Sequence, residues 1–215
     1  MPIFTHILNA TGKLDAVVPY IEPSTTDLAT RINQLLQIPR LDICISPLMD
    51  DRKPECGIAG YSFNPARLEL VIDSVRDDIK RVLQQELAPV LAHEMHHCAR
   101  AAYCKDVTLA DHMITEGLAC HFEKHFNGGK VPGIFNNLAP HGWRDLFHMA
   151  EPVLQKSEFS FEKWFLGSDP ANIPKYAGYW IGYNLVADYL VNRNIAESSL
   201  LQIQGSSILR SFTRA

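Results

Sequence analysis

The spacing of apolar residues changes about one third of the way along the chain. Between residues 41 and 73, apolar residues form short runs rich in β-branched side chains, which are typical of strands. From about Asp77 onward they recur every three or four residues, the spacing of one helix face. The pattern therefore predicts an α+β fold, in which a small N-terminal sheet leads into a mainly helical C-terminal lobe.

Turn and capping residues give approximate limits for these elements. Pro89 suits the first turn of a helix, where its missing N–H costs little, so a helix is expected from about Leu87 to Tyr103. Strands are predicted at His6–Ala10, Leu41–Ser46, Gly57–Phe63 and Leu68–Asp73. Helices are predicted at Ser24–Ile38 with Ser24 or Thr25 as cap, from the capping box at Thr108 and Asp111 to Gly128, and at 142–155, 161–166, 175–192 and 198–210.

Composition and charge narrow the class of protein. The chain has 215 residues, 47% of them hydrophobic, which suits a single domain with sub-lobes of about 1–105 and 106–215. The net charge is −4 without a run of like charges, so neither nucleic acid nor an acidic membrane is expected as a partner. The oligomeric state cannot be predicted from these features.

The N-terminal residues and the cysteines predict the cellular compartment of the protein. The first fifteen residues lack a basic segment and a long apolar core, so no signal peptide is expected. No stretch approaches the roughly eighteen apolar residues of a membrane span. The five cysteines are odd in number and contain no CxxC pair, which predicts free thiols in a reducing cytoplasm.

The stretch LAHEMHHCAR, Leu91 to Arg100, carries the clearest chemistry. His93 and His97 are four residues apart, so on a helix they share one face and can both bind one zinc ion. Glu94 is turned about a quarter of the way round the helix, so it can act as a base beside the metal without binding it. The pattern HExxH thus supplies two ligands and a general base.

A catalytic zinc site also needs a third protein ligand and an open position. Glu116, in ITEGLACHF, lies 19 residues after His97 on the next predicted helix, and a helical hairpin would bring its carboxylate to the His93 and His97 face. His112 and Cys120 share the helix face of Glu116 at four-residue spacing. If either also bound the metal, four protein ligands would leave no open position on the ion, and the site would be structural.

These motifs resemble those of the gluzincin metallopeptidases, the clan of thermolysin and the zinc aminopeptidases. LAHEMHH, ITEGLACHF and AGYWIGYNLV are similar to small bacterial Zn-dependent proteases known only by a domain-of-unknown-function label. The resemblance implies a zincin-like fold, one zinc per chain held by His93, His97 and Glu116, and Glu94 as general base. It also implies that Tyr179, in a Tyr-x-x-Gly motif, stabilises the oxyanion, with Tyr183 and then Tyr176 as alternatives.

Two departures from the clan limit what the resemblance implies. Cys120 stands where thermolysin-like enzymes have an aspartate that orients a zinc histidine, and the exopeptidase motif Gly-x-Met-Glu-Asn is absent. The preferred function is hydrolysis of a peptide or protein substrate by metal-activated water. The alternatives are a non-catalytic metal-binding or interaction module that keeps a zincin fold, and a zinc-free helical protein with solvated histidines.

The remaining histidines and cysteines have simpler interpretations. His96 is expected beside solvent or behind the metal ligands, and His121 and His125 are expected on a polar helix face. Cys98 and Cys104 are expected to be buried thiols. The run Gly57–Phe63 is either an ordinary edge strand or an edge that binds an extended substrate through main-chain hydrogen bonds.

Overall fold

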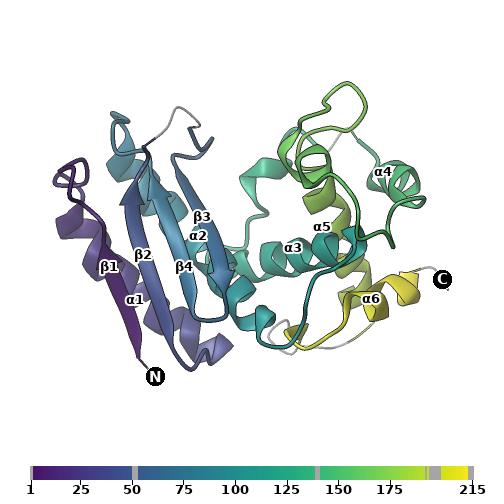
Figure 1. The fold of residues 1–215 in the computed structure, drawn as a ribbon, viewed down its shortest axis with the longest axis horizontal. Helices are drawn as coiled ribbons and strands as arrows, with labels where there is room; N and C mark the ends of the chain where they lie inside the picture. The colour runs from purple at the N-terminus through teal and green to yellow at the C-terminus, as the bar shows by residue number, and fades with distance from the viewer. Residues whose placement is uncertain (1, 50–52, 139–140, 192, 194–199, 213–215) are drawn as a thin grey trace. The chain divides into compact units, whose positions relative to one another are not determined.

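The computed structural model describes residues 2–49, 53–138, 141–191, 193 and 200–212 (Figure 1). The chain forms two units, each with its own internal packing. Unit 1 comprises residues 1–103 and 125–129, and unit 2 comprises residues 104–124 and 130–215. The predicted α+β fold is confirmed, with the strands in unit 1 and mainly helices in unit 2.

Unit 1 is built on a four-stranded sheet with the order β1-β2-β4-β3. Strand β1 (Ile3–Ile7) pairs parallel with β2 (Leu41–Pro47), and β2 pairs parallel with β4 (Arg67–Ile72). Strand β3 (Ile58–Asn64) pairs antiparallel with β4 and ends the sheet. All four strands that the sequence predicts are present, although β1 begins and ends three residues earlier than expected.

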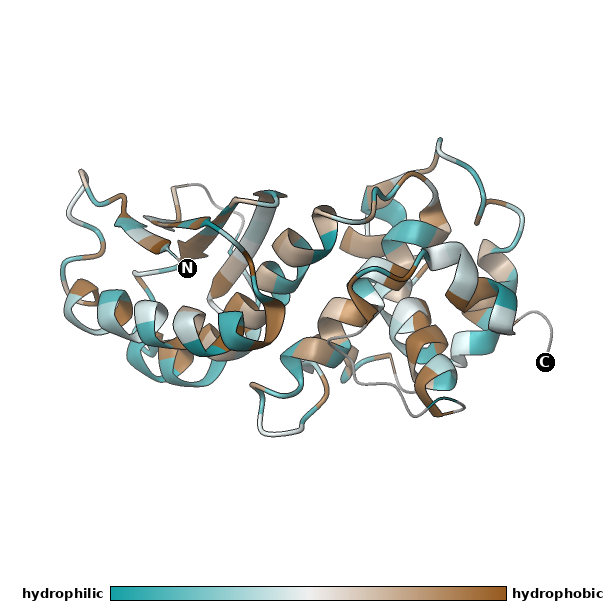
Figure 2. Cartoon of the chain, turned by 90° about the horizontal axis from the view of Figure 1, so that it is seen from below, coloured by the Kyte–Doolittle hydropathy of each residue, from teal (hydrophilic) through white to brown (hydrophobic). Residues whose placement is uncertain are grey.

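One face of this sheet forms the core of unit 1. Helices α1 (Val18–Leu36) and α2 (Ile79–Ala101) lie on the same side of the sheet (Figure 1). Alternate strand residues point toward them and are fully buried, as period-two alternation requires. Along the helices, hydrophobic and hydrophilic residues follow one another in bands (Figure 2), as the 3.6-residue repeat of a helix with one buried face requires. The other face of the sheet carries the half-buried and exposed positions of the strands.

Both helices of unit 1 begin earlier than the sequence predicts. Helix α1 starts at Val18, with Pro19 in its first turn, so Ser24 and Thr25 lie inside the helix and not at its cap. Helix α2 starts at Ile79, so Pro89 lies inside it and is buried. Proline removes one main-chain hydrogen bond there. Burial of Leu83, Leu87 and Leu91 around it compensates for this loss.

The start of α2 is fixed by charged side chains. The Arg76 guanidinium donates to both oxygens of Asp78, at 2.8 Å from Nε and 3.2 Å from Nη2. With a further hydrogen bond from Arg81, these contacts hold the pKa of the Asp78 carboxyl at about 2. Asp78 therefore carries its charge at neutral pH beside the positive end of the α2 dipole.

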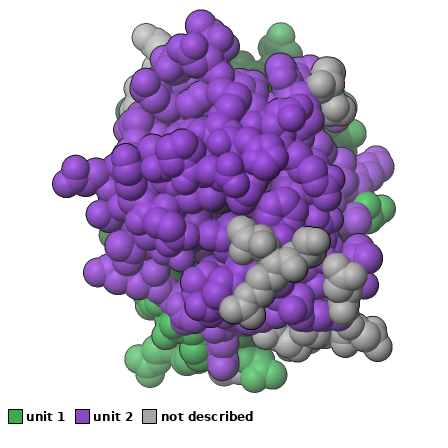
Figure 3. Space-filling model, turned by 90° about the vertical axis from the view of Figure 1, so that its right-hand side faces the viewer, with its two compact units in different colours: residues 1–103, 125–129 green, residues 104–124, 130–215 purple. Residues whose placement is uncertain are grey.

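Unit 2, purple in Figure 3, is mainly helical. Helix α3 begins as predicted, because Thr108 and Asp111 form both halves of a capping box, but it ends at Glu123 and not at Gly128. No described helix is long and apolar enough to cross a lipid bilayer. The elements are α3 (Leu109–Glu123), a 3-10 turn (Gly133–Phe135), α4 (Trp143–Ala150), a π-helical turn (Glu162–Leu166), α5 (Ala177–Val191) and α6 (Gly205–Phe212).

Helices α3 and α5 pack with their backbones in contact. A Cβ atom on Gly182 would overlap the carbonyl oxygen of Met113, and one on Gly117 would lie 2.7 Å from the Tyr183 amide nitrogen. Only glycine fits at either position at this helix separation. The glycine that follows the proposed ligand Glu116 and the glycine of the Tyr-x-x-Gly motif are therefore the contact points of one helix crossing.

Candidate metal centre

The two motif histidines of α2 lie side by side. The ring centroids of His93 and His97 are 4.6 Å apart and their planes meet at 76°. Both side chains are half-buried, in a helix whose other residues near them are mostly buried. Two imidazoles one helical turn apart can present nitrogens to one metal ion. Both histidines belong to unit 1.

Glu94, the candidate base, packs against the edge strand of the sheet. Its side chain occupies the space beside Gly60 of β3, where a Cβ atom on residue 60 would come within 2.8 Å of the Glu94 Oε1 atom. Glu94 itself is only 8% exposed. The absence of a side chain at residue 60 therefore allows the carboxylate to lie against the strand.

Cys98 lies one helical turn after Glu94 and is buried. Burial, together with the smaller effect of the negative charge of Glu94, raises the pKa of the Cys98 thiol to about 12. Cys98 is fully buried, as expected, whereas Cys104 is only half-buried and the prediction for it is wrong. His96 is 1% exposed, which rules out the solvent position for this residue.

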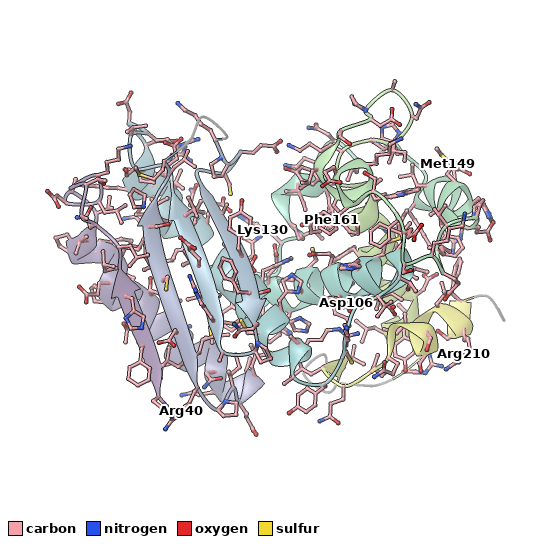
Figure 4. All side chains as sticks on the ribbon, viewed as in Figure 1. Arg40, Asp106, Lys130, Met149, Phe161 and Arg210 are labelled. Atoms are coloured by element: carbon pink, nitrogen blue, oxygen red, sulfur yellow. The ribbon has the colours of Figure 1, made fainter. Side chains whose placement is uncertain are left out.

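Helix α3 carries the other candidate ligands. Glu116 is half-buried and Cys120 is fully buried, and both offer a donor atom that can hold a metal, as does Glu123. His112, one turn before Glu116, has its ring edge against Phe159 and Phe161, with centroids 5.3 and 5.9 Å away. Figure 4 draws these side chains and labels Phe161.

His121 has a different role from the one expected. It is buried, its Nε2 atom lies 2.9 Å from the carbonyl oxygen of Tyr183, and its ring stacks on the Tyr183 ring at 4.1 Å. The prediction of a polar helix face at His121 is therefore wrong. Because Gly182 brings α5 so close to α3, a polar residue of α3 can reach the α5 backbone here.

The two leading tyrosine candidates differ in their surroundings. Tyr183 is buried, in contact with His121 and with Phe135 at a centroid distance of 5.2 Å. Tyr179 is half-buried and meets Phe165 and Tyr176 edge-on, at 5.4 and 5.8 Å. Tyr176 has a φ of 67°, in the left-handed region that favours glycine. The identity of an oxyanion donor among the three stays a prediction.

Gly60 and Gly182 are positions where the sequence itself indicates a close contact. A glycine inside a strand often marks close approach by another group, and one of the two interpretations of Gly57–Phe63 made a substrate that group. At Gly60 the approaching group is the side chain of Glu94. A glycine inside an apolar helix such as α5 similarly marks close helix packing, but the sequence does not name the partner helix.

Comparison with known proteins places these features in a family. The model of a family described as "Predicted Zn-dependent protease (DUF2268)" matches residues 22–210. The chain is 24% identical over 174 residues to the "Uncharacterized protein YjfC" of Bacillus subtilis (strain 168), an alignment that covers 74% of this chain. Since the alignment covers 55% of that protein, the chain spans about half the length of this curated relative. No solved structure matches the chain.

Proposed function

Because the chain belongs to the family of predicted Zn-dependent proteases matched over residues 22–210, we propose that it is a zinc-dependent peptidase of the gluzincin type. Membership supports the reaction class but does not name a substrate. The observation that carries the proposal is the arrangement on α2. Two imidazoles lie 4.6 Å apart, and the carboxylate between them in the sequence packs against the edge strand.

We assign the zinc ligands to His93, His97 and Glu116, with one zinc ion per chain. Two imidazole nitrogens and one carboxylate oxygen are a ligand set that zinc accepts, and three protein ligands leave a position open for catalysis. All three side chains are half-buried, neither fully solvated nor sealed in the core. The family description is consistent with this assignment.

Glu94 is the proposed general base and acid. A bound zinc ion would supply polarisation of the peptide carbonyl and a lowered pKa for a water molecule. The Glu94 carboxylate takes the proton from the attacking water and then delivers it to the nitrogen of the leaving amine. Its packing against Gly60 holds it in one position, which such a proton transfer needs.

Tyr179 is the proposed oxyanion donor. A neutral phenol directed at the developing charge contributes a few kcal/mol in such sites. Tyr179 keeps partial exposure, whereas Tyr183 is buried with its ring stacked on His121, which supports the choice of Tyr179. The Tyr179→Phe protein should bind zinc as the wild type does, and its kcat should fall much more than its KM rises.

The substrate is proposed to be an extended peptide that pairs with β3. This strand ends the sheet, so its outer main-chain groups can pair with an added strand. Glu94 lies against the same strand at Gly60, so a peptide bond held along β3 would pass near the proposed base. Peptide pairing and proton transfer would then depend on one strand.

The Glu94→Gln substitution tests the proposed function. The variant should bind zinc at the wild-type ratio, while its cleavage of a peptide library falls by about 10²–10⁴-fold because the proton acceptor is gone. Glu86→Gln is the control, since Glu86 is a half-buried glutamate on the same helix and should leave cleavage unchanged. Equal cleavage by Glu94→Gln and wild type would contradict the proposal.

A closed, non-catalytic zinc site is the second candidate. Cys120 lies one turn after Glu116 on α3, and it is buried and able to donate a sulfur ligand. A fourth protein ligand would leave no position for a substrate. Replacing zinc with cobalt(II) separates the two candidates, because a thiolate ligand gives a sulfur-to-cobalt charge-transfer band in the near ultraviolet that would be lost in Cys120→Ser.

A further inference from the structure

Two large apolar side chains stand exposed on the edge strand beside the proposed base. Tyr61 and Phe63 of β3 are 57% and 56% exposed, two residues apart in the sequence. Exposed aromatic residues on an edge strand favour pairing of that strand with strands of other chains. Their presence on β3 therefore indicates a functional contact. Neither residue takes part in the hydrophobic core of unit 1.

Strand geometry places these side chains on the open face of the sheet. Gly60 faces α2, where Glu94 packs against it, so its neighbour Tyr61 points to the opposite face. Tyr61 pairs with Glu69 of β4 in the register of the sheet. Phe63 lies in a bulge between Ser62 and Asn64, and the Arg67 guanidinium sits 4.8 Å from its ring centroid. The cation–π contact helps to hold the Phe63 ring in place.

A peptide added to β3 would divide its side chains between two faces. Residues directed toward α2 would pass Gly60 and Glu94, and the alternate residues would lie beside Tyr61 and Phe63. Cross-strand pairs that include an aromatic or β-branched residue stabilise a sheet more than alanine pairs do. The open face therefore contacts every second side chain of such a peptide and none of those between.

We infer that Tyr61 and Phe63 set the sequence preference of this protein. Preferred substrates carry aromatic or β-branched side chains at two positions separated by one residue. The inference rests on the proposed function, because it uses a peptide paired with β3. A substrate fits better than a second copy of the chain as the occupant, because the bulge interrupts a long ladder and the proposed base lies against the same strand.

Matched peptides test the inference. One peptide carries aromatic residues at positions i and i+2, a second carries the same residues at i and i+1, and both share one alanine-rich frame. The wild type should cleave the first with a kcat/KM up to about fivefold higher for each well-placed residue. The ratio should fall to about one in the Tyr61→Ser, Phe63→Ser double variant.

Phe4→Ser is the control variant. Phe4 is 52% exposed and lies on β1, the edge strand at the opposite end of the sheet from β3. In the register of the sheet Phe4 pairs with Asp42, and Asp42 pairs with Arg67. Phe4 therefore lies on the same face of the sheet as Arg67. This variant should keep the wild-type ratio between the two peptides, since a peptide on β3 does not reach β1. A ratio lowered equally by Phe4→Ser would mean that the preference does not come from β3.

The outcomes separate this inference from the proposed function. Two results would overturn the inference but not the proposed function. One is zinc-dependent cleavage without a preference for alternate positions, and the other is a preference that the double variant retains. Absence of zinc-dependent cleavage of any peptide overturns both. A wild-type dimer that the double variant converts to a monomer would show that β3 pairs with a second copy, which also overturns the inference.

Discussion

At the scale of single residues, Gly60 tests whether the position of Glu94 matters for catalysis. In Gly60→Ala the new methyl group would occupy the space of the Glu94 side chain, which must then move. Small displacements of a catalytic group can cost about 10²-fold in rate. We therefore expect kcat to fall by about 10–100-fold while the zinc content stays at the wild-type value, measured by peptide cleavage and elemental analysis.

Gly133→Ala is the control for this substitution. Nothing lies within 4 Å of a Cβ atom at Gly133, so added bulk there should change neither kcat nor zinc content. If Gly60→Ala cleaves peptides at the wild-type rate, then the contact between β3 and Glu94 does not position the base. A loss of zinc in Gly60→Ala would instead assign Gly60 to the integrity of the metal centre.

Asp73 is a second residue with an unusual environment. It is 1% exposed, and among the described residues neither of its carboxylate oxygens has a hydrogen-bond partner. Arg76 is a positive charge near it, but burying a carboxylate without a hydrogen-bond partner costs stability. Asp73→Asn should therefore raise the free energy of unfolding by about 1 kcal/mol, measured by urea denaturation of zinc-free protein.

Asp42→Asn gives the reference value for that experiment. Asp42 is an exposed aspartate of the same unit, hydrogen-bonded to His6 at 2.7 Å, and its replacement should change the free energy of unfolding by less than about 0.5 kcal/mol. Destabilisation by Asp73→Asn would show that the carboxylate has a favourable partner, such as an ordered water molecule or a cation.

At the scale of elements, the sequence predicted which elements exist better than where they begin. The strands around Ile43 and Leu70 follow from β-branched alternation, and the start of α3 follows from its capping box. The start of α2 was missed because Pro89 has a strong local preference for a first turn. Burial of the preceding turns of α2 against the rest of unit 1 outweighs this preference, and a local pattern does not contain that energy.

The crossing of α3 and α5 gives a prediction at the same scale. Alanine is a better helix former than glycine by about 1 kcal/mol, so Gly182→Ala would stabilise an isolated helix. In the protein, the added methyl group meets the Met113 carbonyl oxygen, and overpacking of this kind costs about 1–3 kcal/mol or more. The clash should prevail, so we expect a lower melting temperature in calorimetry, while Gly133→Ala stays at the wild-type value.

At the scale of the whole molecule, sequence and structure inform different parts of the candidate site. Spacing alone predicted that His93 and His97 share a helix face, and their rings are indeed neighbours. The contact of Glu94 with Gly60 joins residues 34 positions apart, and the contact of His121 with Tyr183 joins residues 62 positions apart. Contacts at such separations depend on how sheet and helices pack, which periodicity does not specify.

Zinc content links the proposed site to the stability of the folded chain. A ligand that binds only the folded state stabilises it by about 2.7 kcal/mol when its concentration is 100 times its dissociation constant. The proposed site predicts one zinc per chain in the wild-type protein. A chelator that removes this zinc should therefore lower the melting temperature reversibly. The Glu116→Ala variant should lose the zinc, melt at the temperature of chelated wild type and no longer respond to the chelator.

Each other result would change the ligand assignment in a defined way. Full zinc retention in Glu116→Ala would mean that Glu116 is not an essential ligand, and Cys120 or His112 would take its place as the next variants to make. Retention of zinc together with loss of peptide cleavage would assign Glu116 to the reaction and not to the metal. If neither wild type nor variant holds zinc when purified without chelators, then His93, His97 and Glu94 form a histidine-rich helical turn without a metal function.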